Sequence, residues 1–399
     1  MRVIAPSAKL SRLAALAAIL LLSLASYGQT STANAPGKSA RAVNLLVLGD
    51  SISWGQGLKD EHKAWFLVKK WLELNSGREV RAQVEAHSGA VIGMADPGAD
   101  PRTNYSLDGE LSRAEPTINE QVDNALRSFA DPTQVDLVLV NGCINDVDSR
   151  RLLNAANTPD SIRELAQAKC GPPVEALLRR ITTTFSSAHV VIIGYYPIIT
   201  EFTANDLFMR ALAKRFYTPA AGDPKLNDKG LRARLIAISR EWYQTSDQML
   251  ANAARKIDSE LQASGSHQRV LFADAAFQPE QSFAANRSRL WGFDASTLRK
   301  ILVLLTLGKV PLRTNDERRS QRSDLCKVEF KKPQNETPEQ KAAREDRLLR
   351  CRLAAVGHPN RKGAAMYGDA IGKLLKPLII DTGWLNGAGK IAAPANPIP

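Results

Sequence analysis

Residues 44–52 read Asn-Leu-Leu-Val-Leu-Gly-Asp-Ser-Ile, an apolar run that ends in Gly-Asp and a serine. A short apolar run bounded by turn residues is typical of a buried strand, and it places Ser51 in the tight turn that follows. A serine hydroxyl is a poor nucleophile at neutral pH unless a base lies within hydrogen-bond reach. Near the other end of the chain, residues 357–360 read Gly-His-Pro-Asn, which puts His358 just ahead of a helix. If the fold brings Ser51 and His358 together, we expect a serine hydrolase.

Predicted strands and helices alternate along the chain. The predicted strands are 44–48, 80–85, 135–140, 190–196 and 269–272, and the predicted helices are 60–75, 117–129, 174–184, 204–215 and 231–261. This alternation predicts an α/β fold with a mostly parallel sheet, in outline a flavodoxin-like three-layer α/β/α sandwich with a helical insertion. Active sites of such sheets lie at the carboxyl ends of the strands. Ser51 follows the first strand and Asn145 the third, so we expect both residues at the same edge.

The N-terminus reads as a secretory signal peptide. Basic residues precede an apolar run over 13–24, and small residues follow it. The alternative is a membrane anchor, but the run is shorter than the ~20 residues that span a bilayer. We therefore expect a secreted or periplasmic protein. The predicted segments are a signal peptide 1–28, a linker 29–42, a single domain 43–384 with a helical insertion at about 200–265 and a charged loop with a helix at about 311–350, and a flexible tail 385–399.

The chain has four cysteines, Cys143, Cys170, Cys326 and Cys351. An even number of cysteines in an exported chain suggests disulfides, and four cysteines allow three pairings. We predict the local pairs, Cys143 with Cys170 and Cys326 with Cys351. Each pair closes a loop of roughly 25 residues, worth about 3–4 kcal/mol in the chain-entropy model. The chain contains no Cys-x-x-Cys and its five histidines are scattered, which argues against zinc, and we expect no metal and no cofactor.

The composition argues against a fibrous or wholly disordered protein. Of the 399 residues, 44% are hydrophobic and 24% are charged, which is ordinary for a globular protein. The net charge of +12 falls to about +9 without the signal region, and a basic surface could attract anionic lipid, lipopolysaccharide or acidic polysaccharide. The charge could equally be a general property of an exported protein. Basic residues are not interleaved with aromatic ones, so we expect no nucleic-acid partner. We expect a monomer.

Four short blocks carry a resemblance to a known family. Residues 49–52 (Gly-Asp-Ser-Ile) resemble the first block of the SGNH, or GDSL, hydrolase superfamily. Residues 87–90 (His-Ser-Gly-Ala), 142–146 (Gly-Cys-Ile-Asn-Asp) and 357–360 (Gly-His-Pro-Asn) resemble the remaining blocks in order. The resemblance extends over about residues 44–375. It implies the α/β/α fold and ester hydrolysis through an acyl-enzyme.

The resemblance also implies roles for individual residues. Ser51 is the nucleophile, and His358 is the general base and then the general acid. The oxyanion donors are the backbone N–H groups of Ser51 and Gly89 and the side-chain amide of Asn145, and losing one such donor costs roughly 3–4 kcal/mol. Each residue has a structural alternative: a helix N-cap for Ser51, a turn with positive φ for Gly89, and an Asx-turn for Asn145. Gly93 could also replace Gly89.

The chain departs from the family pattern in two places. Cys143 stands where the third block usually has glycine, and its predicted disulfide would brace the loop that holds Asn145. Ala355 stands where an aspartate usually precedes the histidine by three residues. Some secreted esterases of the superfamily use a main-chain carbonyl there, and the carbonyl of Ala355 could act in this way, leaving a dyad of Ser51 and His358. The alternatives are an acid from elsewhere in the chain or reduced activity.

Histidine with a pKa near 6.5 suits both proton-transfer roles, so we expect activity to fall as the pH drops through that value. We interpret the other four histidines as structural, namely His62, His87, His189 and His267, although His87 adjoins the second block and could line the site.

The chain is therefore expected to be a secreted, metal-independent serine esterase or lipase that acts on a small-molecule or lipid ester. A polysaccharide O-acetylesterase with the same machinery is the second expectation. A non-catalytic glycan- or surface-binding protein on a degenerate hydrolase scaffold is the third. A deep apolar slot would favour a lipid, and a shallow open site a sugar ester. Four large aromatic residues near the blocks could line an acyl pocket or belong to the core; these are Trp54, Trp65, Trp291 and Phe293.

Overall fold

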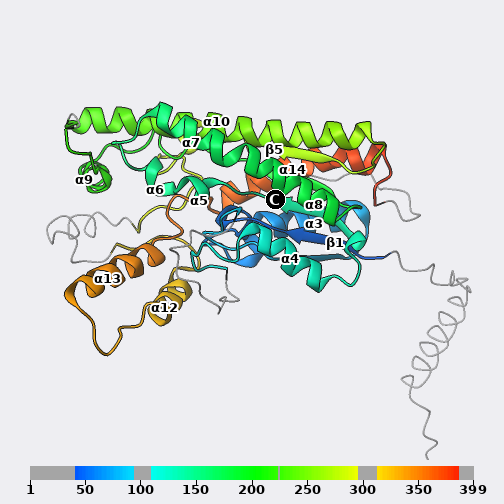
Figure 1. Ribbon diagram of the computed structural model, residues 1–399, viewed down its shortest axis with the longest axis horizontal. Helices are drawn as coiled ribbons and strands as arrows, with labels where there is room; N and C mark the ends of the chain where they lie inside the picture. Colours follow the sequence, from blue (N-terminus) through cyan, green and yellow to red (C-terminus); the bar gives the residue numbers. More distant parts are fainter. Residues whose placement is uncertain (1–40, 94–108, 223–224, 295–311, 386–399) are drawn as a thin grey trace, which may run out of the picture. The chain divides into compact units, whose positions relative to one another are not determined.

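The predicted strands form one sheet in which every neighbouring pair is parallel, in the order β2-β1-β3-β4-β5 (Figure 1). The strands are β1 (Val43–Val47), β2 (Val80–Val84), β3 (Val135–Val140), β4 (His189–Ile193) and β5 (Val270–Ala273). This order is that of the flavodoxin-like doubly wound fold, so the predicted fold class is confirmed. The computed structural model describes residues 41–93, 109–222, 225–294 and 312–385. The predicted signal peptide and the predicted tail (except Leu385) lie outside these ranges, as does most of the linker.

Two sets of helices flank the sheet. α3 (Ala64–Ser76) packs against α14 (Arg361–Asp381) and against β2. In the second set, α8 (Pro172–Thr184) packs against α4 (Ile118–Ser128) and α10 (Asp228–Ala263), and α10 also packs against α7 (Pro159–Cys170) and β5. All six residues of β3 are buried, and all but Asp136 are apolar, which is typical of a central parallel strand. The sheet therefore forms the centre of the core, and its carboxyl-end loops remain to form a site.

Local signals set the helix ends. Thr117 and Glu120 form a capping box at the start of α4, and Gly77 ends α3 in a left-handed conformation (φ 65°). α7 was not among the predicted helices, although Thr158 and Ser161 form a capping box there as well. Only three of its side chains are buried, so its apolar stripe is narrow. Other helices are α2 (Ser51–Trp54), α5 (Ile144–Val147), α6 (Ser149–Leu152) and α9 (Leu207–Phe216), and 3-10 turns lie at Asp60–His62, Pro132–Gln134 and Pro279–Gln281.

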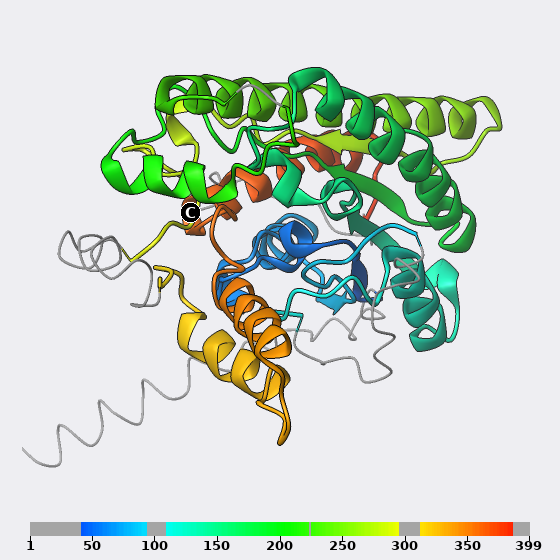
Figure 2. The same ribbon diagram turned by 60° about the vertical axis from the view of Figure 1, so that its left-hand side comes forward.

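The charged segment that was expected to be a loop with one helix contains two helices, α12 (Arg319–Glu329) and α13 (Pro338–Arg352). They lie side by side in both ribbon views, and we call residues 319–352 the two-helix arm (Figures 1 and 2). The disulfide Cys326–Cys351 joins the two helices, and the disulfide Cys143–Cys170 joins the start of α5 to the end of α7. Both predicted pairings are confirmed. The arm was underestimated because its helices bury few side chains, which are Arg322 and Cys326 in α12 and Cys351 in α13.

Among the described residues, no helix has the length and apolarity needed to cross a membrane. The apolar stretch 301–307, which is too short to span a membrane and suits a buried helix better, lies outside the described residues. All described strands and helices fall within one unit, Ala42–Pro399. The predicted segment boundaries remain predictions.

Candidate active site

Ser51 is the first residue of α2, which residues 48–50 join to β1, and this turn is held by a buried polar network. Asp50 is the N-cap of α2, and its carboxylate accepts hydrogen bonds from the N–H of Ile52 at 2.9 Å and the side-chain amide of Asn141 at 2.7 Å. The Tyr195 hydroxyl donates to the same carboxylate at 3.2 Å. Burial raises the pKa of Asp50 to about 6, against the lowering effect of these donors. The network fixes Ser51 at the end of the strand.

His358 lies in the short segment between the two-helix arm and α14, as predicted. Its Nε2 lies 2.7 Å from Oγ of Ser51, so a nucleophile and a base 307 positions apart come within hydrogen-bond reach. The segment is held through its backbone. The N–H of Trp291 donates to the carbonyl of His358 at 2.7 Å, the N–H of Gly357 donates to the carbonyl of Trp291 at 2.9 Å, and the Tyr196 hydroxyl donates to the carbonyl of Gly357 at 2.8 Å.

The second ring nitrogen of His358 faces no carboxylate. Nδ1 is buried and makes no hydrogen bond of regular geometry among the described residues. The carbonyls of Ala355 and Val356 act on the ring and raise its pKa slightly. Burial dominates, followed by the charge of Arg322, and together they lower the pKa of His358 to about 4. The expected titration near 6.5 is therefore corrected: desolvation disfavours the charged imidazolium, so the ring of His358, half-buried in the cavity wall, remains neutral and able to accept a proton well below that pH.

The predicted oxyanion donors line the same cavity as Ser51 and His358. Gly89 has φ 84°, and a Cβ there would lie 2.6 Å from the backbone of Arg113, so only glycine fits. The alternative Gly93 donates its N–H to the carboxylate of Asp146 instead. The side chain of Asn145 donates to the carbonyl of Ala90 at 2.9 Å, which orients the amide and leaves its second N–H for the cavity. The backbone N–H of Ser51, at the start of α2, has no intrahelical acceptor.

Cys143 shows why a residue other than glycine at this position needs support. Its φ is 107°, in the region that favours glycine, so the departure from the family pattern costs of order 1–3 kcal/mol of backbone strain. The disulfide to Cys170 holds this conformation at the N-cap of α5, the helix that carries Asn145. The N–H of Ile144 donates to the Tyr195 hydroxyl at 3.0 Å, so Tyr195 also ties this loop to the turn of Ser51.

The sequence interpretation missed three anchoring residues, Tyr195, Asn141 and Gln121. The side chain of Gln121 accepts from the N–H of Gly49 at 2.7 Å and donates to its carbonyl at 3.0 Å. Asn141 and Tyr195 follow buried strands at the edge of the sheet where site residues lie. Their position at this edge could have identified them from the sequence. His87 is buried, and its Nδ1 lies 2.9 Å from the carbonyl of Ser88; it is not one of the cavity-lining residues.

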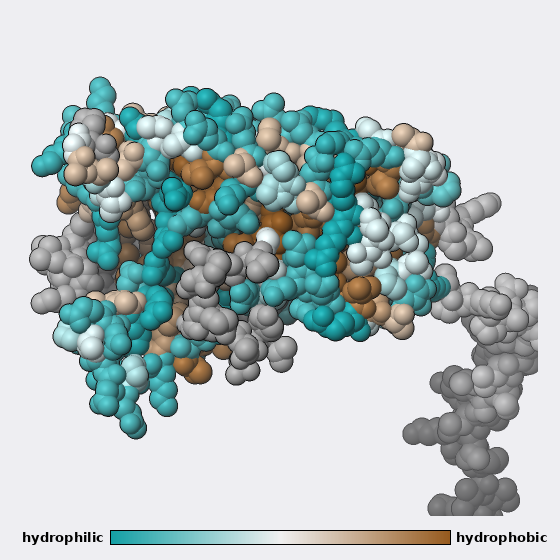
Figure 3. Space-filling view, in the orientation of Figure 1, coloured by the Kyte–Doolittle hydropathy of each residue, from teal (hydrophilic) through white to brown (hydrophobic). Residues whose placement is uncertain are grey.

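The cavity beside the dyad has a volume of about 1810 Å³. Of the four aromatic residues considered from sequence, Phe293 lines it, whereas Trp54 donates to Glu110 at 3.1 Å and Trp65 packs against the core. Apolar and charged side chains both contribute to the wall. Figure 3 shows one face of the protein, where hydrophilic side chains predominate and hydrophobic ones gather in recessed areas. Among the described residues, no group of three or more His, Cys, Asp or Glu side chains could hold a metal ion.

The sheet order and the shared sheet edge of the blocks agree with the α/β/α fold that the sequence resemblance implied. No family model matches the sequence, and no curated protein matches it. Three solved structures illustrate the likeness. An extracellular lipase from Streptomyces rimosus is 16% identical with a TM-score of 0.37, covering 62% of this chain and 87% of that one.

A carbohydrate acetylesterase from Sinorhizobium meliloti is 15% identical with a TM-score of 0.31, covering 61% and 87% of the two chains. A putative arylesterase from Agrobacterium tumefaciens is 16% identical with a TM-score of 0.34, covering 84% and 98%. These likenesses are too low for the activities of those proteins to be transferred to this chain.

Proposed function

We propose that this chain is an exported serine ester hydrolase that uses a dyad of Ser51 and His358. The observation that carries the proposal is the 2.7 Å distance between Oγ of Ser51 and Nε2 of His358, beside a cavity that also contains Gly89 and Asn145. The same distance argues against the alternative of a binding protein on a degenerate scaffold.

The residues suggest a two-step acyl transfer. His358 accepts the proton of Ser51 at Nε2 while Oγ attacks the ester carbonyl carbon. The N–H groups of Ser51 and Gly89 and the amide of Asn145 stabilise the oxyanion. The tetrahedral intermediate expels the alcohol, which takes the proton from His358. Water then attacks the acyl-serine, with His358 again accepting and returning the proton, and releases the carboxylic acid.

The cavity supports an extended ester as the substrate. A volume of about 1810 Å³ exceeds the 300–1,000 Å³ of a usual small-molecule pocket. The cavity wall includes apolar side chains that suit an acyl chain, namely Ile198, Phe283, Phe293 and Val356. A lipid or other acyl ester is therefore the first candidate.

A polysaccharide O-acetyl ester is the second candidate, and a particular observation favours it. Arg210, Arg215 and Arg347 line the same cavity, are exposed, and have no ion pair among the described residues. Cationic side chains without acidic partners would attract an acidic polysaccharide.

Hydrolysis of p-nitrophenyl esters from acetate to long acyl chains, by the protein without its first 28 residues, tests the proposal. We expect turnover that Ser51→Ala abolishes, with an unchanged melting temperature. Ser53→Ala is the matched control, because Ser53 is on the same helical turn, is buried, and its hydroxyl has no hydrogen-bond partner among the described residues. An optimum at long chains favours the lipase, and one at acetate favours the acetylesterase. Equal turnover by Ser51→Ala would refute the serine mechanism.

A further inference from the structure

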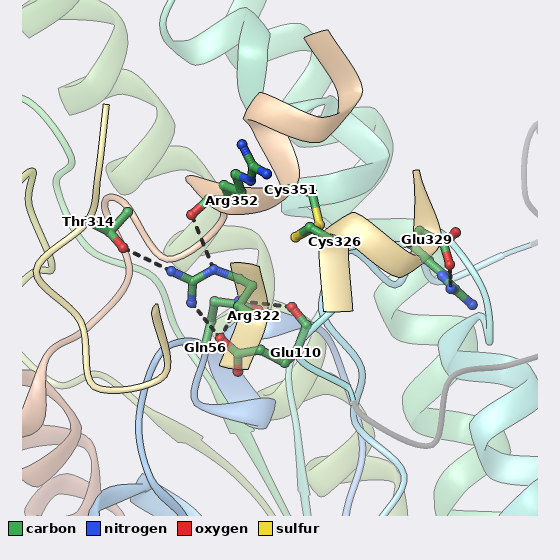
Figure 4. The surroundings of a disulfide bond; sticks show 9 residues. Gln56, Glu110, Thr314, Arg322, Cys326, Glu329, Cys351 and Arg352 are labelled. Carbon is green, nitrogen blue, oxygen red and sulfur yellow. Dashed lines mark hydrogen bonds and ion pairs between the residues drawn. A yellow bond between two sulfur atoms is a disulfide. The ribbon is translucent and has the colours of Figure 1, made fainter. Parts of the chain in front are cut away.

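A fully buried ion cluster lies at the base of the two-helix arm. The side chains of Arg322, Glu110 and Asp316 have no exposed surface. Arg322 donates through Nη1 to Glu110 at 2.6 Å and to Asp316 at 3.0 Å, and through Nη2 to Asp316 at 2.5 Å and to Thr314 at 3.0 Å. Its Nε donates to the carbonyl of Arg352 at 3.3 Å (Figure 4). All five N–H groups of the guanidinium therefore have acceptors.

Stability alone does not explain this cluster. Desolvating charged groups costs several kcal/mol per ion, and replacing a buried ion cluster by apolar residues is often neutral or stabilising. Burial raises the pKa of Glu110 even though Arg322 lies against it, which shows how unfavourable the environment is for charge. The further contacts of the residues that bind Arg322 suggest another role.

Glu110, the first partner, is connected by hydrogen bonds to the turn that carries Ser51. Its carboxylate accepts from the side chain of Gln56 at 2.8 Å and from the N–H of Gly57 at 3.1 Å. The N–H of Gln56 donates in turn to the carbonyl of Ser51 at 3.0 Å. The side chain of Gln56 also accepts from the hydroxyl of Ser88, the residue before the predicted oxyanion glycine. Glu110 therefore holds the turn that carries Ser51 and the loop that carries Gly89.

Arg352, a second partner, begins the segment of the chain that carries His358. Arg352 ends α13, and the chain runs from it through the buried Ala355 to His358. The disulfide Cys326–Cys351 reinforces the same junction, one helical turn from Arg322 along α12 and next to Arg352 along α13. Arg322 thus bonds simultaneously to the support of the nucleophile and to the start of the histidine segment.

The turn after Ser51 and the segment before His358 are in close contact at Gly57. A Cβ added to Gly57 would lie 2.8 Å from Cβ of Ala355 and 3.0 Å from Cβ of Asp316. The turn of Ser51 therefore packs directly on the segment of His358, and the buried cluster lies at this contact.

His358 needs such support because no carboxylate contacts its Nδ1 among the described residues. In a triad, a hydrogen bond from that atom to a carboxylate orients the imidazole. We propose that Arg322, bound to Glu110 and Asp316, is a positioning residue that holds the turn of Ser51 against the segment of His358 and replaces the orienting role of the missing carboxylate. This inference rests on the proposed function, since it concerns the same dyad.

Arg322 also acts on His358 through its charge. The charge of Arg322 lowers the pKa of His358 and that of Asp316 raises it, both after burial. A substitution that keeps the charge but loses the geometry separates these effects, and Arg322→Lys is that substitution. A lysine cannot bond to Arg352, Glu110, Asp316 and Thr314 together.

Arg344→Lys is the matched control. Arg344 is on the same arm and forms an ion pair with Glu336 at 2.6 Å, but that pair does not line the cavity. The measurements are kcat and KM for a p-nitrophenyl ester, the rate of Ser51 labelling by a fluorophosphonate, and the melting temperature. We expect Arg322→Lys to lower kcat and the labelling rate about 100-fold, because a misplacement of about 1 Å has that effect, with KM within about twofold. Arg344→Lys should keep both rates.

Either of two results would overturn the inference: a folded Arg322→Lys with wild-type rates, or an equal loss of rate in Arg344→Lys. If Arg322→Lys does not fold, the triple variant Arg322→Met, Glu110→Gln, Asp316→Asn removes all three charges and leaves none unpaired. It should fold with slow labelling, and wild-type labelling would overturn the inference. Failure of the proposed function has a different signature, namely no Ser51-dependent hydrolysis by the wild type while labelling still reports on Arg322. No labelling of the wild type would overturn both.

Discussion

The lowered pKa of His358 predicts how activity depends on pH. Because burial lowers this pKa to about 4, the ring should be about 90% neutral at pH 5, whereas a histidine with the ordinary pKa of 6.5 would be about 3% neutral. The neutral ring is the form that accepts the proton of Ser51, so kcat/KM at pH 5 should remain at about nine-tenths of its value at pH 8. An ordinary histidine would give a loss of about 30-fold.

The assay is kcat/KM for p-nitrophenyl butyrate between pH 4.5 and 8, with release of p-nitrophenol followed at its isosbestic wavelength. Asp50 complicates the profile, because its pKa is raised to about 6 and its carboxylate caps the helix of Ser51. Asp50→Asn retains a good N-cap and does not titrate, so a step near pH 6 that disappears in this variant belongs to Asp50.

The stability of the folded chain also depends on pH, which limits the range over which activity can be measured. His358 and His189 both have pKa values lowered to about 4 in the folded chain. The unfolded chain therefore binds protons first, and their contribution to stability is complete above about pH 6.5 and is lost as the pH falls towards 4. Melting temperatures measured at each pH define where the chain is folded. A tenfold fall of kcat/KM between pH 7 and 5, in folded wild type and in folded Asp50→Asn, would refute the buried neutral base.

Three further outcomes follow from the site and its surroundings. Asn145→Ala should lower kcat on p-nitrophenyl acetate by about 10²–10³ with little change in KM, and an unchanged kcat would remove Asn145 from the oxyanion hole. Gly57→Ala should lower kcat, because the new methyl would meet Ala355 in a backbone with φ 82°; full activity would show that the contact relaxes freely. Asp247→Asn should raise the free energy of unfolding at pH 7 by about 2–4 kcal/mol, measured by urea titration. Burial raises the pKa of Asp247 to about 8, so the wild-type carboxyl disfavours folding increasingly as the pH rises from about 4 to 8. A destabilised variant would contradict this.

The sequence predicted the parts of the fold that depend on local pattern. Most strands read as short apolar runs, which parallel sheets bury, and residues 80–85 alternate apolar and polar side chains in the edge strand β2, so strand positions and fold class followed. The same topology brought the turn of Ser51 and the loop of Asn145 to one edge. The disulfide pairings followed from short spacing in the chain.

The residues that hold the site together were not predicted, and the reason is physical. Arg322 stands in a stretch rich in arginine and acidic residues, where the charge pattern indicates a solvated surface. Only its partners distinguish it from Arg318 and Arg319, and one of them, Glu110, is 212 positions away. Tyr195 was interpreted only as part of a strand, because a hydroxyl that joins two distant loops leaves no periodic signal.

The separation of Ser51 and His358 along the chain determines when in biosynthesis the proposed active site can exist. The five strands that the structure describes are complete at Ala273, so a chain shortened shortly after that residue would contain them and Ser51 but not His358. A contact between residues 307 positions apart closes a very long loop, and such contacts form late in folding. A nascent chain should therefore expose a formed but inert serine, and ester hydrolysis should begin only when synthesis has passed His358 and α14 has docked.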